Sequence, residues 1–321
     1  MLITLFFTWV RKLSSRSQAE SSAPATWFRY MESHIACLQR CGQYRTAETY
    51  RATLNSFSRF RRGCDLRLDE FVPELVSDYE TYLKRKGLCP NTIVFYLKRL
   101  RSVYNQAADD GLVQDCRPFR KVSVTAEKTT KRALSLSAIR RLRLMDLYES
   151  PSKRKARDLF LLSFYLRGMS FVDMAHLRKK DLRNGVLTYR RQKTGQLLTI
   201  RWEPCMEHLA SRYAAPSSSP YLISIIADAD GDTRRQYQSA LASVNRHLHD
   251  LGRSLRLQRP LTMYVARHSW ATIARKEGIP LSVISEGMGH DSENTTQIYL
   301  ASLEANVIDE ANRKILSRLG I

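Results

Sequence analysis

Two residues that could do chemistry lie close together in this 321-residue chain. His290 and Tyr299 are nine positions apart in the stretch SEGMGHDSENTTQIYL. A phenol has an unperturbed pKa of about 10, so it is a poor nucleophile at neutral pH unless cationic groups surround it. An imidazole can stabilise a developing negative charge by donating a hydrogen bond. We therefore ask whether Tyr299 attacks an anionic substrate, and which elements would position it.

Motifs for nucleotide or metal chemistry are missing from the sequence. It contains no loop of the form G-x-x-x-x-G-K-[ST] and no G-x-G-x-x-G after a strand. His34, Cys37 and Cys41 have the spacing of one helix face without a nearby fourth ligand, which favours buried structural residues over a metal site. The six cysteines form no Cys-x-x-Cys pair, which favours reduced thiols in a cytosol. We predict no metal and no cofactor, so the chain either only binds its partner or reacts through its own side chains.

The chain is strongly basic. Lys and Arg number 52 against 31 Asp and Glu, a formal net charge of +21, which is more than solubility requires. A polyanion is the leading partner, and nucleic acid is the commonest polyanion. A basic protein without such a partner is the alternative. Because the basic residues are spread along the whole chain, they predict an extended folded surface.

The opening stretch MLITLFFTWVRKLSS has an apolar run too short to span a bilayer, and no basic region precedes it. We interpret residues 1–24 as an N-terminal arm that lies against DNA or a partner. No other segment of the sequence is long and apolar enough for a membrane span. These features predict a soluble protein with no membrane partner. With nucleic acid as the leading partner, the expected location is the cytoplasm, in association with the nucleoid.

Residues 25–121 have the pattern of a helical domain. Amphipathic helices are predicted at TAETYRATLNSFSRFRR and PNTIVFYLKRLRSVYNQAADDG, the second capped by Asn91. Their buried stripes are predicted at Tyr50, Leu54, Phe57 and Phe60, and at Ile93, Leu97, Leu100 and Tyr104. The remaining faces are basic and either bind phosphates or are simply solvated. The candidate DNA-binding residues on them are Arg51, Arg59, Arg61, Arg62, Lys98, Arg99 and Arg101.

Residues 122–132 lose the apolar periodicity and are predicted to be an exposed linker. A second domain follows at 133–321, since a chain with 43% hydrophobic residues and this length can bury two modest cores. A hairpin is predicted at GVLTYRRQKTGQLLTIRW, turning at residues 193–195. Helices are predicted at 135–147, 156–168, 233–252, 264–278 and 280–289, then around Tyr299 and near 310–320.

The stretch MGHDSENTTQIYL, together with YVARHSWAT upstream, resembles the carboxy-terminal signature of the tyrosine recombinase, or phage integrase, family. That signature is an R-H-[ST]-x-A-[ST] block, then L-G-H, then T-x-x-Y at this His-to-Tyr distance. The resemblance extends over most of the chain. It implies a mainly α fold: a helical, SAM-like, DNA-clamping N-terminal domain and a mostly helical catalytic domain with a small antiparallel sheet, the DNA breaking-rejoining enzyme fold.

The resemblance also implies a role for each catalytic residue. Arg267 would clamp two non-bridging phosphate oxygens through its planar fork, and His290 would donate a hydrogen bond to the same phosphate. Lys193, in the hairpin turn, would protonate the departing 5′-oxygen. Tyr299 would attack, leaving a 3′-phosphotyrosine and a free 5′-hydroxyl. Rejoining then needs neither ATP nor metal, because the covalent link preserves a reactive phosphodiester.

The sequence departs from the family pattern at two catalytic positions. Alignment to T-G-L-R-x-x-E places Ser170 where a second arginine is expected. Tyr264 stands where the family usually has a histidine, and it is a candidate catalytic residue because its hydroxyl keeps one hydrogen-bond donor. A lost phosphate donor typically costs about 10² to 10³ in rate. Arg167 is the candidate substitute, although a helical side chain there would lean away from position 170. Asp173 matches the family's acidic position and is expected to orient Arg267, with a plain surface carboxylate as the alternative.

The sequence therefore predicts a site-specific tyrosine recombinase of the integrase or invertase type. Its expected partners are double-stranded DNA with inverted-repeat sites, three further copies of the chain in a tetramer that passes through a Holliday junction, and accessory DNA-bending proteins. The rivals are a catalytically weakened DNA-binding protein on the same fold and a type IB topoisomerase-like enzyme. Retention of Lys193, Arg267, His290 and Tyr299 argues against decay.

The tail EANVIDEANRKILSRLGI carries an apolar stripe at helical spacing that something must cover. In the family such a tail docks on the neighbouring protomer, and packing on its own domain is the alternative. The stripe consists of Val307, Ile308, Ala311, Ile315 and Leu316.

Overall fold

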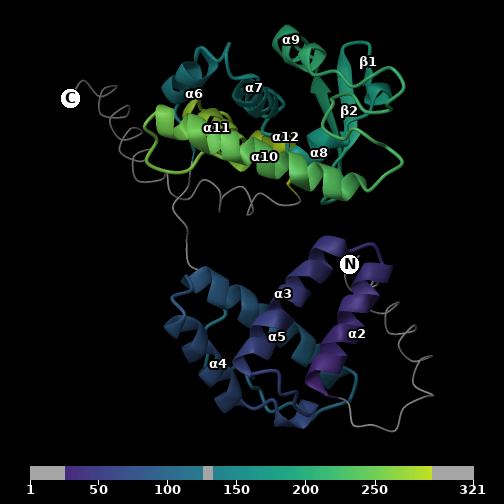
Figure 1. The fold of residues 1–321 in the computed structure, drawn as a ribbon, viewed down its shortest axis with the longest axis vertical. Coiled ribbons are helices and arrows are strands. Elements are labelled where there is room, and N and C mark those ends of the chain that lie inside the picture. Colours follow the sequence, from purple (N-terminus) through teal and green to yellow (C-terminus); the bar gives the residue numbers. More distant parts are fainter. Residues whose placement is uncertain (1–25, 126–132, 291–321) are drawn as a thin grey trace. The chain divides into compact units, whose positions relative to one another are not determined.

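The structure is a computed structural model that describes residues 26–125 and 133–290 (Figure 1). The predicted arm at 1–24, the candidate nucleophile Tyr299 and the apolar tail lie outside the described residues. The chain divides into two compact units between residues 129 and 130. Each unit has its own hydrophobic core, and each is described by itself.

The N-terminal unit is a set of helices around an aromatic core. Trp27 stacks on Phe71 with a ring-centroid distance of 4.0 Å, and Phe57 meets Tyr79 edge to face at 5.0 Å. All four rings are buried, so they add specific aromatic contacts to the area that they remove from water. The elements are α2 (Trp27–Arg40), α3 (Tyr44–Phe60), the short 3-10 helix η1 (Leu68–Glu70), α4 (Pro73–Arg85) and α5 (Pro90–Asp109).

The predicted apolar stripes face this core. On α3 the predicted positions are buried except Phe60, which is half-buried at the last turn, and on α5 all of them are buried. The predicted cap of α5 is wrong. The helix begins at Pro90 with Cys89 as its N-cap residue, so Asn91 lies inside the first turn. Proline suits the first helical position because its fixed φ is already helical and the missing N–H would have no partner there.

His34, Cys37 and Cys41 are half-buried rather than buried. They lie beside the stripe of α2 that enters the core through Trp27 and Met31. In the part of the chain that the structure describes, no group of three His, Cys, Asp or Glu side chains could hold a metal ion. None of the helices within 26–125 and 133–290 combines the length and apolar character that a bilayer span requires.

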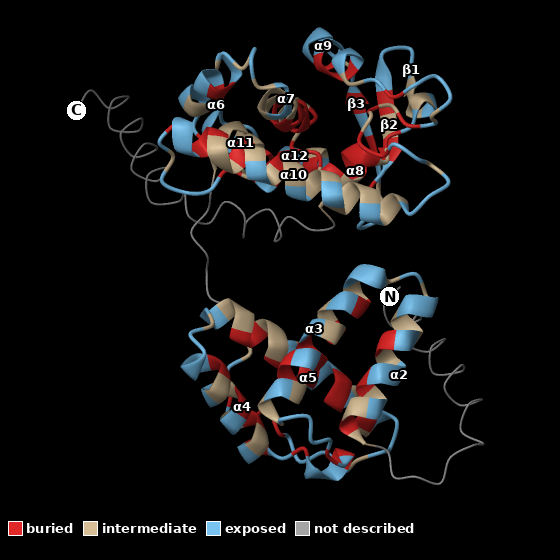
Figure 2. Cartoon of the chain, in the orientation of Figure 1, coloured by how far each residue is buried: buried red, intermediate tan, exposed pale blue. Residues whose placement is uncertain are grey.

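The C-terminal unit is built around α7 (Pro151–Tyr165), whose residues from Leu159 to Ser163 are all buried. Around it pack α6 (Leu136–Arg143), α9 (Pro204–Arg212), α10 (Thr233–Ser254) and α11 (Met263–Lys276). The shorter elements are α8 (Phe171–Ala175), the 3-10 helix η2 (Lys179–Asp181) and α12 (Leu281–Met288). Figure 2 shows the buried residues gathered on the inward faces of these helices.

A small antiparallel sheet completes the C-terminal unit. Its strands lie in the order β1 (Leu182–Arg183), β2 (Val186–Arg190), β3 (Leu197–Arg201). Tyr189 pairs with Leu198, and both side chains are buried, as is every second residue along the two strands. The predicted hairpin is confirmed, and Gly195 in its turn has a φ of +72° that favours glycine.

Candidate active site

Arg267 is buried on α11 and its guanidinium is fixed by two backbone carbonyls. Nη1 donates to the Gly168 carbonyl at 3.0 Å and Nη2 donates to the Met288 carbonyl at 2.6 Å. The first contact depends on glycine, because a Cβ at position 168 would lie 2.5 Å from the Arg267 Cα. Gly168 also has a φ of +71°. The turn after α7 and the end of α12 thus hold the arginine in one place.

His290 lies beside Arg267 because of the way α12 ends. Gly289 adopts a left-handed conformation, its N–H donates to Glu286 and the His290 N–H donates to Ser285, which is a Schellman ending. The Arg267 Nη2 donates to the His290 Nε2 at 2.9 Å. Since guanidinium has no acceptor, Nε2 must accept here, which puts the proton of a neutral ring on Nδ1.

A second arginine that the sequence did not single out enters the same place. Arg191 directly follows β2 and is 8% exposed. Its Nη1 donates to the Gly289 carbonyl, and its Nε lies 3.9 Å from Asp173 Oδ2. Burial, together with the positive charge of Arg191, lowers the pKa of Arg267 to about 10. At neutral pH the Arg267 guanidinium is still charged, because this pKa lies well above 7.

The alternation of buried and exposed residues along β2 could have predicted that Arg191 points inward. The buried positions of β2 are Leu187 and Tyr189, and the same alternation carried one step further points residue 191 inward. Arg190 takes the opposite face: it is exposed and its Nη1 donates to the Gly195 carbonyl at 3.1 Å.

Asp173, which the family resemblance assigns to orienting Arg267, has other contacts. Its Oδ2 accepts from Ser170 Oγ at 2.6 Å, and its Oδ1 accepts from the Gln192 N–H at 2.7 Å. The arginine with which Asp173 forms an ion pair is Arg191. Ser170, at the position of the expected arginine, is the N-cap of α8 and accepts from the Asp173 N–H at 3.3 Å.

Three of the remaining candidates lie within the described residues, each in a different setting. Arg167 lies beyond the end of α7 with a φ of +58°, and its Nη1 donates to the Thr199 carbonyl of β3 at 3.4 Å. Tyr264 is 53% exposed on the first turn of α11, and its ring lies 4.8 Å from that of His268. Lys193 is exposed in the hairpin turn. Tyr299 lies outside the described residues.

The chain matches two family descriptions along its length. Residues 26–123 match the Phage integrase SAM-like domain and residues 136–306 match the Phage integrase family. The chain belongs to the phage integrase family. Tyrosine recombinase XerA of Pyrococcus furiosus is 27% identical to this chain over 267 residues, which cover 70% of this chain and 88% of the relative.

Two solved structures show the same fold as this chain. A lambda integrase tetramer bound to a Holliday junction has a TM-score of 0.66 at 16% identity, with 89% of this chain and 80% of that chain covered. The Tn1549 transposon integrase in complex with transposon right end DNA has a TM-score of 0.65 at 17% identity, with 92% and 100% covered. The expected fold is therefore confirmed, and the chain is a site-specific tyrosine recombinase.

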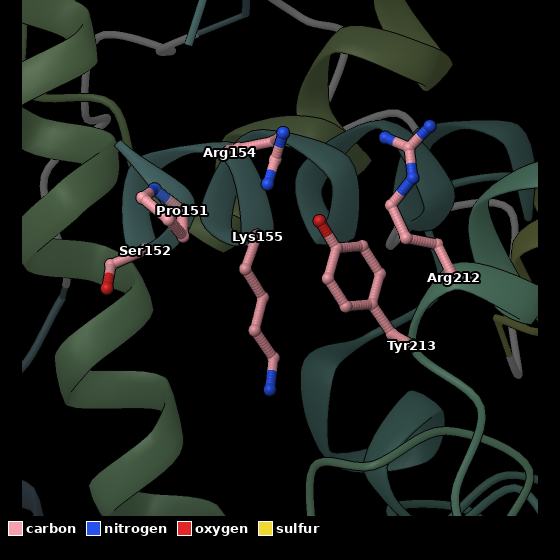
Figure 3. Close-up of a pocket in the computed structure, with 6 residues that line it drawn as sticks. All are labelled: Pro151, Ser152, Arg154, Lys155, Arg212 and Tyr213. Carbon is pink, nitrogen blue, oxygen red and sulfur yellow. The ribbon is translucent and has the colours of Figure 1, made fainter. Parts of the chain in front are cut away.

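The pocket in Figure 3 is separate from the site around Arg267, Arg191 and His290. It is lined by Pro151, Ser152, Arg154, Lys155, Arg212 and Tyr213, none of which belongs to the arginine cluster. Two of these residues bind the buried carboxylate of Asp158, which accepts from Arg212 Nη1 and from the Tyr213 hydroxyl, each at 2.8 Å. Burial and that hydrogen bond raise the pKa of Tyr213 to about 12. These contacts join α7 to α9 and have a structural role.

The candidate DNA-binding residues of α3 and α5 differ in their surroundings. Arg51 is paired with Glu32, and its Nη2 donates to Glu32 Oε2 at 2.5 Å. The Arg99 guanidinium lies over the rings of Tyr50 and Phe95, 5.3 Å and 5.6 Å from their centroids. Arg59 Nε donates to a backbone carbonyl of its own helix and Arg61 is half-buried. The exposed members of the set are Arg59, Arg62, Lys98 and Arg101.

Proposed function

We propose that this recombinase exchanges strands of duplex DNA through a covalent bond between Tyr299 and a 3′-phosphate. The observation that carries the proposal is the buried Arg267 beside the half-buried His290, with 2.9 Å between Nη2 and Nε2 and with the guanidinium held by two carbonyls. A charge fixed in this way does not have to reorganise when negative charge develops on a phosphate. The sequence places Tyr299 nine residues after this histidine.

The proposed reaction divides the work among four side chains. The planar fork of Arg267 binds non-bridging phosphate oxygens, and His290 donates a further hydrogen bond to them. The hydroxyl of Tyr299 gives up its proton to solvent, and its oxygen attacks phosphorus as the bond from phosphorus to the 5′-oxygen breaks. Lys193 gives that departing oxygen a proton. A phosphodiester is exchanged for a phosphodiester, so the reverse reaction rejoins the strand without an added energy source.

The proposed substrate is double-stranded DNA with inverted-repeat recombination sites. The net charge of +21 supports this partner. The lambda integrase in the structural comparison forms a tetramer on a Holliday junction, and we infer that this recombinase also acts as a tetramer. Its place would be the nucleoid in the cytoplasm, where such DNA is found.

The test is to trap the covalent intermediate. The substrate is a duplex that carries the inverted repeats flanking the gene and has a nick beside the cleavage point. After cleavage the short leaving strand dissociates, so the strand cannot be rejoined and the protein stays attached. We expect an adduct at a 3′-phosphate, with the linked peptide containing Tyr299. Tyr299→Phe removes only a hydroxyl, so it should keep DNA affinity and form no adduct. An adduct linked to another residue, or one that persists in Tyr299→Phe, would overturn the assignment.

A further inference from the structure

We propose that Arg191 supplies, from the β2–β3 hairpin, the second guanidinium for the scissile phosphate that position 170 does not provide. The proposal rests on the proposed function, because it concerns the same phosphate. It makes the hairpin the source of two catalytic cations, Arg191 on its inner face and Lys193 in its turn. Neither Ser170 nor Arg167 then has to act in cleavage.

The two arginines converge on one turn of backbone. Arg267 Nη2 donates to the carbonyl of Met288, and Arg191 Nη1 donates to the carbonyl of Gly289. These carbonyls belong to consecutive residues, and His290 follows them directly. Arg267 approaches from α11 and Arg191 approaches from the hairpin. Their guanidinium groups therefore lie together beside the histidine.

Gly289 makes the approach of Arg191 feasible. A Cβ at this position would lie 2.8 Å from Arg191 Cδ, closer than side-chain carbons can pack. The residue also has a φ of +63°. The glycine that ends α12 thus brings the Arg191 side chain, as well as His290, into the cluster.

The charges around Arg191 are those of an anion site. Two buried guanidinium groups lie close together, and Asp173 is the carboxylate within ion-pair distance of Arg191, at 3.9 Å from Nε. Within the described residues, Arg191 Nε is buried without a hydrogen-bond partner. A buried donor of this kind is costly unless something accepts from it. A phosphodiester brings both a negative charge and acceptor oxygens.

Within the described residues, neither Ser170 nor Arg167 donates to the carbonyls of Met288 and Gly289, where the two arginines meet. Ser170 Oγ donates to Asp173 and caps α8, and Arg167 Nη1 donates to the Thr199 carbonyl. Asp173 links the two positions at issue, since the same Oδ2 accepts from Ser170 and faces Arg191. The serine thus positions the carboxylate that holds the substitute arginine. A purely structural role for Arg191, pinning the hairpin to α12, is the competing explanation.

The experiment compares Arg191→Ala and Arg191→Gln with Arg190→Ala, whose arginine is exposed on the other face of the hairpin. Glutamine keeps a donor for the Gly289 carbonyl but has no charge. Each full-length variant is assayed for duplex binding by gel shift and for single-turnover cleavage of the nicked duplex. We expect both Arg191 variants to bind like the wild type and to cleave about 10² to 10³ times more slowly. Arg190→Ala should cleave normally.

A second substrate distinguishes a catalytic role of Arg191 from a structural one. A methylphosphonate at the scissile position replaces one charged non-bridging oxygen with a methyl group, so it needs less positive charge from the protein. If Arg191 acts on that charge, the defect of both variants should largely disappear on this substrate. An equal defect on both substrates, or wild-type cleavage by Arg191→Gln on the phosphodiester, would overturn the proposal. Failure of the wild type to form any adduct would instead overturn the proposed function.

Discussion

Gly289 is a single residue on which two side chains depend, because it turns the chain toward His290 and leaves room for Arg191. Gly289→Ala should cost about 1–2 kcal/mol for the left-handed backbone, and more for the contact with Arg191 Cδ at 2.8 Å. The matched control is Gly278→Ala, where φ is +80° but nothing lies within 4 Å of the added carbon. Urea unfolding should show the larger loss for Gly289→Ala, and only that variant should lose cleavage. Equal losses would show that the close approach to Arg191 does not matter.

Substitution of Ser170 tests whether this residue itself contacts the scissile phosphate. Its hydroxyl caps α8 and bonds Asp173, so Ser170→Ala should cost about 1 kcal/mol of unfolding free energy. Ser135→Ala, which removes the cap of α6, should cost a similar amount. Cleavage by Ser170→Ala should fall much less than that of Arg191→Ala, because Asp173 keeps its bond to the Gln192 N–H when the serine hydroxyl is lost. A loss as large as that of Arg267→Ala would place Ser170 itself at the phosphate.

At the scale of elements, the basic residues of α5 have two different roles, DNA binding and packing. Lys98 and Arg101 are exposed, whereas Arg99 packs over two aromatic rings. Lys98→Ala and Arg101→Ala should weaken DNA binding and each reduce the slope of log affinity against log salt by about 1. Arg99→Ala should chiefly lower the free energy of unfolding, because it loses packing. An unchanged salt slope in both exposed variants would show that this face of α5 does not contact phosphate.

The elements also show what the sequence could and could not predict. Helical periodicity was enough for the buried faces of α3 and α5, and the alternation in β2 and β3 was enough for the hairpin. The motif around Arg267 and His290 predicted residues that the structure brings within hydrogen-bond distance. The contacts of Asp173 were not predictable, because they depend on the hairpin packing against α8 and α12. Arg191 was missed because no motif covers it and its inward direction follows only from the strand register.

At the scale of the whole molecule, the two units should fold separately. The N-terminal unit has its own aromatic core, so a fragment of residues 26–125 should unfold cooperatively in urea, followed by circular dichroism. The full chain should show that transition and a second one from the C-terminal unit. A fragment without a cooperative transition would contradict independent folding.

The net charge of the whole chain predicts how DNA affinity depends on salt concentration. Each phosphate that the protein neutralises contributes about −0.9 to the slope of log affinity against log salt. With a charge of +21, affinity for duplex DNA should therefore fall steeply between low and physiological salt. Fluorescence anisotropy with a labelled duplex measures this slope, and a flat dependence would contradict DNA as the partner.

The carbonyl contacts of Arg191 and Arg267 also determine when side-chain entropy is lost. A long arginine side chain gives up about 1.5–2 kcal/mol of rotamer freedom when it is fixed in one conformation. The carbonyls of Gly168, Met288 and Gly289 fix both arginines during folding. The free energy of DNA binding therefore carries no further ordering cost for them, so a phosphate meets side chains that are already in place.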